Sequence, residues 1–148
     1  MINYKIKHDD FLNLIELYQE SENPLNEFET WDNVLTIFKH APLTCISKDC
    51  NNKFKELPEK ITIYRGILLK ENSDFDIDVG VSWTTDSKIA KMFAYRFLRL
   101  GGEACILKAE ARKKDVLFYN DEREEREIII DPINLENIHR INLVEINN

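Results

Sequence analysis

The chain has 148 residues, of which 43% are hydrophobic and 32% charged. This length and balance predict one soluble domain over residues 1–148 that buries its own core. The net charge of −7 argues against non-specific binding to nucleic acid or anionic membranes, and no apolar run approaches the ~20 residues of a membrane span.

The helical part of the chain is expected within about the first 58 residues. Apolar side chains recur there at i, i+3, i+4 and i+7 in two windows, which predicts two amphipathic helices. These residues are Phe11, Leu14, Ile15 and Tyr18, then Trp31, Val34, Leu35 and Phe38. Asp9 or Asp10 is the expected N-cap of the first helix, and Asn26 or Thr30 that of the second. Residues 46–56 predict a third, weaker helix.

From about residue 59 onward the pattern changes to short strands. They are expected near residues 61–65, 79–85, 103–110, 115–119, 126–131 and 138–146. One helix interrupts them, with Asp86 as its cap, an apolar stripe from Ile89 to Leu98, and Gly101-Gly102 at its end. Helices followed mainly by strands predict an α+β fold, with the N-terminal helices packed on a largely antiparallel β-sheet.

The cysteines and glycines limit which disulfides, metal sites and nucleotide-binding loops the chain can form. The three cysteines are Cys45, Cys50 and Cys105, an odd number that favours a reducing, cytoplasmic environment over a disulfide framework. The first ten residues lack the apolar core of a signal peptide. No metal-site spacing joins the cysteines to the three histidines, so no metal is expected. Four glycines cannot build a Rossmann or P-loop nucleotide site.

Residues 61–66, Ile-Thr-Ile-Tyr-Arg-Gly, predict a buried strand that ends in a cation. Arg65 there is either a surface or ion-paired arginine, or a clamp on a phosphate or ribose. Gly66 has no Cβ, so its backbone groups could face a flat carboxamide.

Residues 80–85, Gly-Val-Ser-Trp-Thr-Thr, form a hydroxyl-rich strand end. Hydroxyl residues in strands are often there only because they favour β-structure. Alternation nevertheless places Ser82 and Thr84 on one face, with Trp83 and Thr85 on the other. One face could therefore bind a ligand while Trp83 packs or stacks.

Residues 121–127, Asp-Glu-Arg-Glu-Glu-Arg-Glu, lead directly into three isoleucines. A charge run of this kind is usually a solvated loop. Glu127 nevertheless lies at the boundary between solvent and core, where a carboxylate can be positioned and its pKa tuned. Glu125 and Glu127 would share one face of the strand if the strand began that early.

Taken together, these segments resemble the mono-ADP-ribosyltransferases of the arginine–serine–glutamate class. That family has an arginine at a strand end, a Ser-Thr-Ser strand followed by an Ala-x-x-Phe-Ala helix, and Glu-x-Glu entering an apolar strand. The resemblance covers roughly residues 61–131. One departure is Trp83, which stands where the first serine usually lies. The hydroxyl that orients the catalytic glutamate is then expected from Thr85, with Ser82 or no residue at all as the alternatives.

The resemblance implies an ADP-ribosyltransferase-like fold, with a split sheet, and an enzyme that transfers ADP-ribose from NAD⁺ to a protein side chain. Arginine is the leading acceptor. Glu127 would stabilise the ribose cation and Glu125 would position or deprotonate the acceptor. The expected NAD⁺ contacts are Arg65, Gly66, Ser82, Thr84 and Thr85, and candidate contacts to ligand or target are Trp83, Phe93 and Tyr119.

Two other functions fit the same residues. An NAD⁺ glycohydrolase would use water as the acceptor. A non-enzymatic binding or inhibitor protein could carry the same fold with a decayed site, which Trp83 and the acidic surface favour. The expected partners are NAD⁺ and a macromolecular target, most simply a protein, with no membrane or nucleic acid. The small size suits a stand-alone intracellular modifier of toxin or phage origin, in which case the compartment would be the host cytoplasm.

Overall fold

The computed structural model describes residues 7–20, 30–41, 44–69, 80–96, 103–121 and 125–141. Within them the fold is α+β, with helices packed on an antiparallel sheet of six strands. The helices are α1 (His8–Glu20), α3 (Trp31–Lys39), α4 (Lys48–Glu56) and α5 (Ser87–Arg96). The strands are β1 (Lys60–Leu69), β2 (Ser82–Thr84), β3 (Glu103–Arg112), β4 (Val116–Asn120), β5 (Glu127–Ile130) and β6 (Glu136–Ile141). None of the described helices has the length and apolar character that crossing a membrane requires.

The strand order is β4-β5-β2-β1-β3-β6, so β1, β2 and β5 are neighbours although they are far apart in the sequence. β1 pairs with β3 over its whole length, from Lys60↔Arg112 to Leu69↔Glu103. β1 pairs with β2, in contrast, at Tyr64↔Thr84 only, among the described residues. The backbone pairing between β1 and β2 therefore stops one residue before Arg65.

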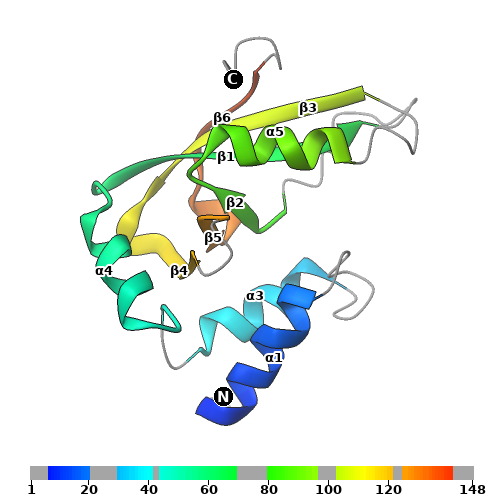
Figure 1. The fold of residues 1–148 in the computed structure, drawn as a ribbon. Helices are drawn as coiled ribbons and strands as arrows, with labels where there is room; N and C mark the ends of the chain where they lie inside the picture. Colours follow the sequence, from blue (N-terminus) through cyan, green and yellow to red (C-terminus); the bar gives the residue numbers. More distant parts are fainter. Residues whose placement is uncertain are drawn as a thin grey trace.

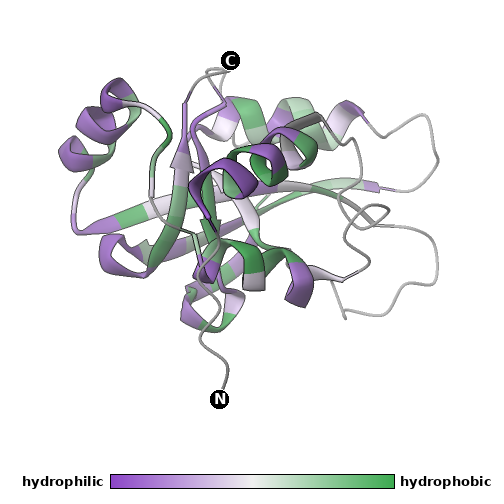
Figure 2. Cartoon of the chain, turned by 90° about the horizontal axis from the view of Figure 1, so that it is seen from below, coloured by the Kyte–Doolittle hydropathy of each residue, from purple (hydrophilic) through white to green (hydrophobic). Residues whose placement is uncertain are grey.

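The main apolar cluster occupies the sheet face that carries Trp83 of β2. Trp83 packs there with isoleucines of β1 and β5 and with apolar residues of β3 and β4. Helix α4 adds Phe54 to this cluster, stacked on Tyr119 with ring centroids 5.6 Å apart. Ser47 caps α4 by accepting a hydrogen bond from the Cys50 amide at 3.1 Å. Figure 2 shows that α4 is otherwise mostly hydrophilic, as expected of a helix at the periphery.

Helices α1 and α3 form a second cluster, which covers the opposite face of the β4–β5–β2 part of the sheet (Figure 1). Its centre is aromatic: the Phe11 and Phe118 rings meet edge to face at 5.9 Å, and Phe38 lies 5.3 Å from Phe118. Thr30 caps α3 by accepting from the Asn33 amide at 3.2 Å. An ion pair of 2.7 Å between Lys39 and Asp131 fixes the far end of α3 to the end of β5.

Helix α5 lies along β1 and β3 (Figure 1) and approaches them closely through small residues. Ala90 and Ala94 face the strands from the helix. A Cβ added at Gly66 would lie 2.1 Å from the Ala90 carbonyl oxygen and 2.6 Å from the Ala94 amide nitrogen. Only glycine fits this position, because the helix backbone occupies the space of any side chain.

The sequence-based expectations of an α+β fold, of helices in both N-terminal windows and of an antiparallel sheet are confirmed. Thr30 and Asp86 are confirmed as caps, the latter by a 2.9 Å bond from the Lys88 amide. Asp9 and Asp10 are not N-caps, because α1 begins at His8 and both lie in its first turn. Asn26, the Gly101-Gly102 helix end and residues 142–146 of the last strand lie outside the described residues.

The limits of β1, β2 and β5 differ from those expected from the sequence. β1 continues past Arg65 to Leu69, because β3 pairs with it throughout. Arg65 is therefore inside a strand and not at its end. β2 has only three residues and begins at Ser82, and β5 begins at Glu127.

We predict that Gly66→Ala destabilises the fold by about 3 kcal/mol, because the new methyl group collides with helix backbone that cannot move away locally. Urea denaturation followed by circular dichroism measures this. Thr62→Ala, at an exposed position of the same strand, is the matched control and should cost less than about 1 kcal/mol. Equal losses for the two variants would contradict the role given to Gly66.

Candidate active site

Three neighbouring strands bring an arginine, a serine and a glutamate into contact. Arg65 lies on β1, Ser82 is the first residue of β2, and Glu127 is the first residue of β5. Glu127 pairs with Thr84 and Ser82 pairs with Ile129. Since paired residues on antiparallel strands project to the same face, Ser82 and Glu127 share a face at the point where α1 and α3 cover the sheet.

The Glu127 carboxylate is held by two hydroxyl groups. The Ser82 hydroxyl donates a hydrogen bond to Glu127 Oε2. The Tyr18 hydroxyl donates to the same oxygen at 3.2 Å, across 109 residues of sequence. Ser82, and not Thr85, thus supplies the strand hydroxyl that orients the glutamate, which reverses the order expected from the sequence.

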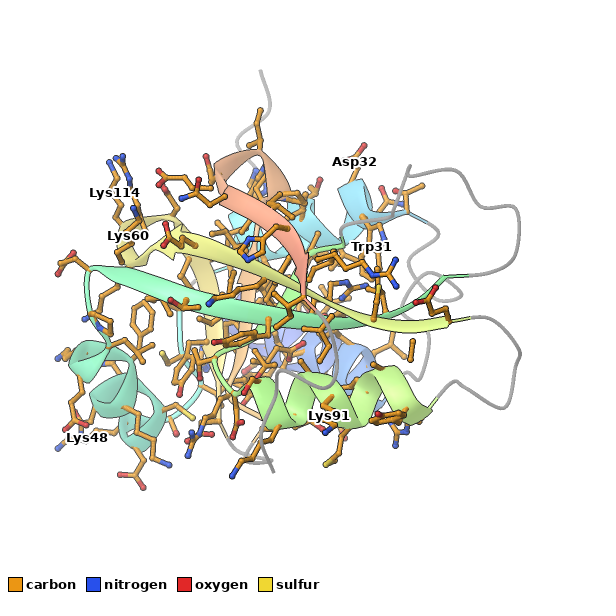
Figure 3. All side chains as sticks on the ribbon, turned by 90° about the horizontal axis from the view of Figure 1, so that it is seen from above. Trp31, Asp32, Lys48, Lys60, Lys91 and Lys114 are labelled. Carbon is orange, nitrogen blue, oxygen red and sulfur yellow. The ribbon has the colours of Figure 1, made fainter. Side chains whose placement is uncertain are left out.

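Arg65 is held on the other side of Ser82. Its Nη1 donates to the Ser82 carbonyl oxygen at 2.8 Å, and its guanidinium lies 5.5 Å from the centre of the Trp31 ring. Figure 3 shows Trp31 between the start of α3 and the strands. A cation at this distance from an indole is attracted by the negative face of the ring.

Gly80 leaves room for the Arg65 guanidinium. Its backbone is left-handed, with φ of +67°, and a Cβ added there would lie 2.4 to 2.7 Å from three guanidinium atoms. Glycine is therefore required twice at this position, by its backbone conformation and by the side chain that passes over it.

The electrostatics of the site centre on Glu127. Burial raises the pKa of the Glu127 carboxyl above its ordinary value, and the charge of Glu125 acts in the same direction. Hydrogen bonds from Ser82 and Tyr18, and the charge of Arg65, oppose that rise in pKa. Burial and then the charge of Glu127 raise the pKa of Tyr18. Tyr18 therefore stays a protonated donor at neutral pH.

Glu125 lies outside the strand that carries Glu127. Arg126 between them has φ of 48°, in the left-handed region, so the strand alternation that would put both carboxylates on one face does not extend to Glu125. The expectation that Glu125 and Glu127 share one face required the strand to begin by Glu125, and β5 begins at Glu127. Glu125 is nevertheless close enough for its charge to affect the pKa of Glu127.

Three contacts fix this left-handed turn to the residues after β2. The Thr84 hydroxyl donates to the Glu125 carbonyl at 2.7 Å. The Thr85 amide donates to the Arg126 carbonyl at 3.2 Å, and the Arg126 side chain lies 3.7 Å from a carboxylate oxygen of Asp86. Thr84 is buried and also accepts from the Asp86 amide at 3.1 Å. Both threonines therefore support the turn that leads into Glu127.

Several other candidate residues from the sequence lie in the core or in contacts between helices and strands. Trp83 is 2% exposed and belongs to the main core, and Tyr119 is 3% exposed and stacks on Phe54. Neither can contact a ligand or target from these positions. Phe93 is half-buried on α5, where the Arg96 guanidinium lies 5.7 Å from its ring. Gly66 serves the contact with α5.

Sequence reasoning missed Tyr18 and Trp31. Both were assigned only to the apolar stripes of their helices, and both reach the site from the α1–α3 layer that covers the sheet. One available signal was that a buried tyrosine hydroxyl needs a polar partner. Another was that an indole at a helix start can cover a cation.

Comparison of the chain with protein-family models, with curated proteins and with solved structures found no match. Among the described residues, no group of three or more histidine, cysteine, aspartate or glutamate side chains is arranged to hold a metal ion. The function is therefore inferred from the residues themselves.

We predict that Glu127→Gln stabilises the protein at neutral pH. A carboxyl whose pKa is raised by folding contributes stability below its unfolded pKa of about 4.3, and that contribution is lost as pH rises through the folded pKa. Glutamine keeps an acceptor for the two hydroxyls and carries no charge. The expected gain is roughly 0.5–2 kcal/mol at pH 7, and it should shrink toward pH 4.

Thermal and urea denaturation between pH 4 and pH 8 test this. Glu16→Gln is the control, since it removes the same charge from an exposed position on α1. A Glu127→Gln variant that is no more stable than the Glu16→Gln variant at pH 7 would contradict the burial of a charged carboxylate here.

Proposed function

We propose that this protein is a mono-ADP-ribosyltransferase that transfers ADP-ribose from NAD⁺ to a protein side chain, with arginine as the leading acceptor. The observation that carries the proposal is the convergence of Arg65 and Glu127 on Ser82. The three residues come from three segments that are separate in the sequence. The proposed function requires this meeting, because Arg65 and Glu127 have to contact the same bound NAD⁺.

Arg65 is proposed to hold the negatively charged part of NAD⁺, its pyrophosphate or adenosine ribose. A guanidinium offers five N–H donors in a planar fork that matches phosphate oxygens, and the Ser82 carbonyl fixes its position through Nη1. Beyond Tyr64 the edge of β1 toward β2 is not paired with β2 in the described residues. The backbone of Gly66 is proposed to bind the nicotinamide carboxamide along this edge.

Glu127 is proposed to stabilise the transition state. When the bond between nicotinamide and ribose breaks, positive charge develops on the ribose ring. A carboxylate that accepts a hydrogen bond from the ribose 2′-hydroxyl stabilises that charge. Its effect is large because Glu127 is already oriented by Ser82 and Tyr18 and partly removed from water.

Glu125 is proposed to position or deprotonate the acceptor. An arginine guanidinium is protonated at neutral pH and is a poor nucleophile, so it needs a carboxylate nearby. Glu125 precedes the left-handed Arg126 and is half-buried. The net charge of −7 favours approach of a cationic target segment.

We predict that the wild-type protein labels a macromolecule in cell lysate when supplied with NAD⁺ labelled in its adenylate part. Glu127→Gln should lower the rate by about 10²–10³-fold, the usual cost of losing a preorganised charge contact. Arg65→Ala should mainly raise KM for NAD⁺. Arg112→Ala, at an exposed position on β3, is the matched control and should retain activity.

The outcomes separate the candidate functions. Free nicotinamide and ADP-ribose without a labelled macromolecule would assign the protein as an NAD⁺ glycohydrolase. Neither labelling nor hydrolysis, together with no thermal shift at millimolar NAD⁺, would leave a non-enzymatic protein and overturn the proposal. For comparison, a ligand at 100 times its Kd raises the free energy of unfolding by about 2.7 kcal/mol.

We also predict that Gly80→Ala weakens NAD⁺ binding by displacing the Arg65 guanidinium. Isothermal titration with NAD⁺ measures the change in Kd, expected at roughly tenfold for a loss of about 1.4 kcal/mol. The same substitution in an Arg65→Ala background separates displacement from backbone strain. If Gly80 acts through Arg65, the second substitution should have little further effect on Kd. Equal effects in the two backgrounds would contradict this role.

A further inference from the structure

Tyr18 is the least expected member of the site. It belongs to α1 and follows the spacing of an apolar stripe, and its side chain is 7% exposed. Its ring meets Phe38 edge to face, with centroids 5.4 Å apart. Packing on α3 thus fixes the direction of the ring, and the ring carries the hydroxyl to Glu127 at the start of β5.

The two hydroxyl donors to Glu127 end on the same carboxylate oxygen. Ser82 and Tyr18 both donate to Oε2. Within the described part of the chain, Oε1 accepts no hydrogen bond. A carboxylate held at one oxygen by two donors from different elements has its plane and direction fixed, and its second oxygen is left for a ligand.

We propose that Tyr18 is a positioning residue for Glu127: together with Ser82 it holds Oε2, so that Oε1 is directed to the ribose 2′-hydroxyl of the substrate. This inference rests on the proposed function and extends it. It gives α1 a part in the reaction, since the helix supplies the second hydroxyl to Glu127 beside that of Ser82 on β2.

The charges around Glu127 determine how its pKa would change if the Tyr18 hydroxyl were removed. Arg65 on β1 lowers the pKa of the Glu127 carboxyl, Glu125 raises it, and the hydroxyls of Ser82 and Tyr18 lower it by bonding the charged form. Removing the Tyr18 hydroxyl leaves burial and Glu125 less opposed. The pKa of Glu127 therefore rises, and the acidic limb of the rate profile moves to higher pH.

A purely structural role for Tyr18 predicts something different. If Tyr18 only packed α1 against α3, Tyr18→Phe would keep the ring and its contact with Phe38. Activity and pH dependence would then stay as in the wild type. The phenylalanine variant therefore isolates the hydroxyl.

The experiment measures NAD⁺ turnover against pH for the wild type, Tyr18→Phe and Tyr119→Phe. Tyr119 is the matched control, a buried tyrosine in the other apolar cluster. Tyr18→Phe should lower kcat roughly 10- to 100-fold, the cost of a hydrogen bond to a charged group, with KM for NAD⁺ little changed because Arg65 is intact. Its acidic limb should move to higher pH. Tyr119→Phe should match the wild type in both.

A second readout does not depend on turnover. Protein labelled with ¹³C at the glutamate carboxyl is titrated by NMR, and the Glu127 signal is identified by its loss in Glu127→Gln. Tyr18→Phe should raise the midpoint of that signal, and Tyr119→Phe should not. An active wild type with unchanged kcat, acidic limb and carboxyl midpoint in Tyr18→Phe would overturn the inference and leave the proposed function standing. An inert wild type would overturn the proposed function, and the carboxyl midpoint would then decide by itself whether Tyr18 holds Glu127.

Discussion

The site depends on Ser82, which uses its two oxygen atoms to hold two opposite charges. Its backbone carbonyl accepts from Arg65, and its hydroxyl donates to Glu127. A charge removed from water is costly unless it is hydrogen-bonded and balanced. One short strand between β1 and β5 meets that requirement for both charges at once. The end of the β1–β2 pairing next to Arg65 leaves the serine carbonyl available for the guanidinium.

The helices at the start of the chain complete this arrangement. Tyr18 bonds Glu127 and Trp31 covers Arg65, so each charged residue has one aromatic partner from the α1–α3 layer. Aromatic packing among Phe11, Phe38 and Phe118 holds that layer against β4. The raised pKa of Glu127 records the energetic cost, since burial disfavours its charged form. At neutral pH the charged form of this carboxyl therefore lowers the stability of the fold.

Much of the fold could be predicted because local patterns decide it. The stripes from Phe11 and Trp31 predicted α1 and α3, and the caps Thr30 and Asp86 were correctly assigned. The alternation in residues 82–84 correctly separated Ser82 from the buried Trp83. The end of β1 was expected too early, at Arg65, because its continuation to Leu69 depends on pairing with β3. The strand expected near residues 126–131 is present as β5, but nothing in the local sequence requires the left-handed Arg126 that precedes it. Contacts from the residues around the end of β2 hold Arg126 there.

The sequence by itself determined the residue types of the candidate site and their order, because a charged or hydroxyl side chain next to a short apolar run stands out in the local pattern. It also determined the α+β class, since the change from helical to strand periodicity is local. Only the tertiary structure decided which hydroxyl reaches Glu127, why Gly66 and Gly80 must be glycine, and that Tyr18 and Trp31 belong to the site. These are contacts between segments up to 109 residues apart. Such contacts depend on how the helices dock on a twisted sheet, and no spacing along the chain encodes that docking.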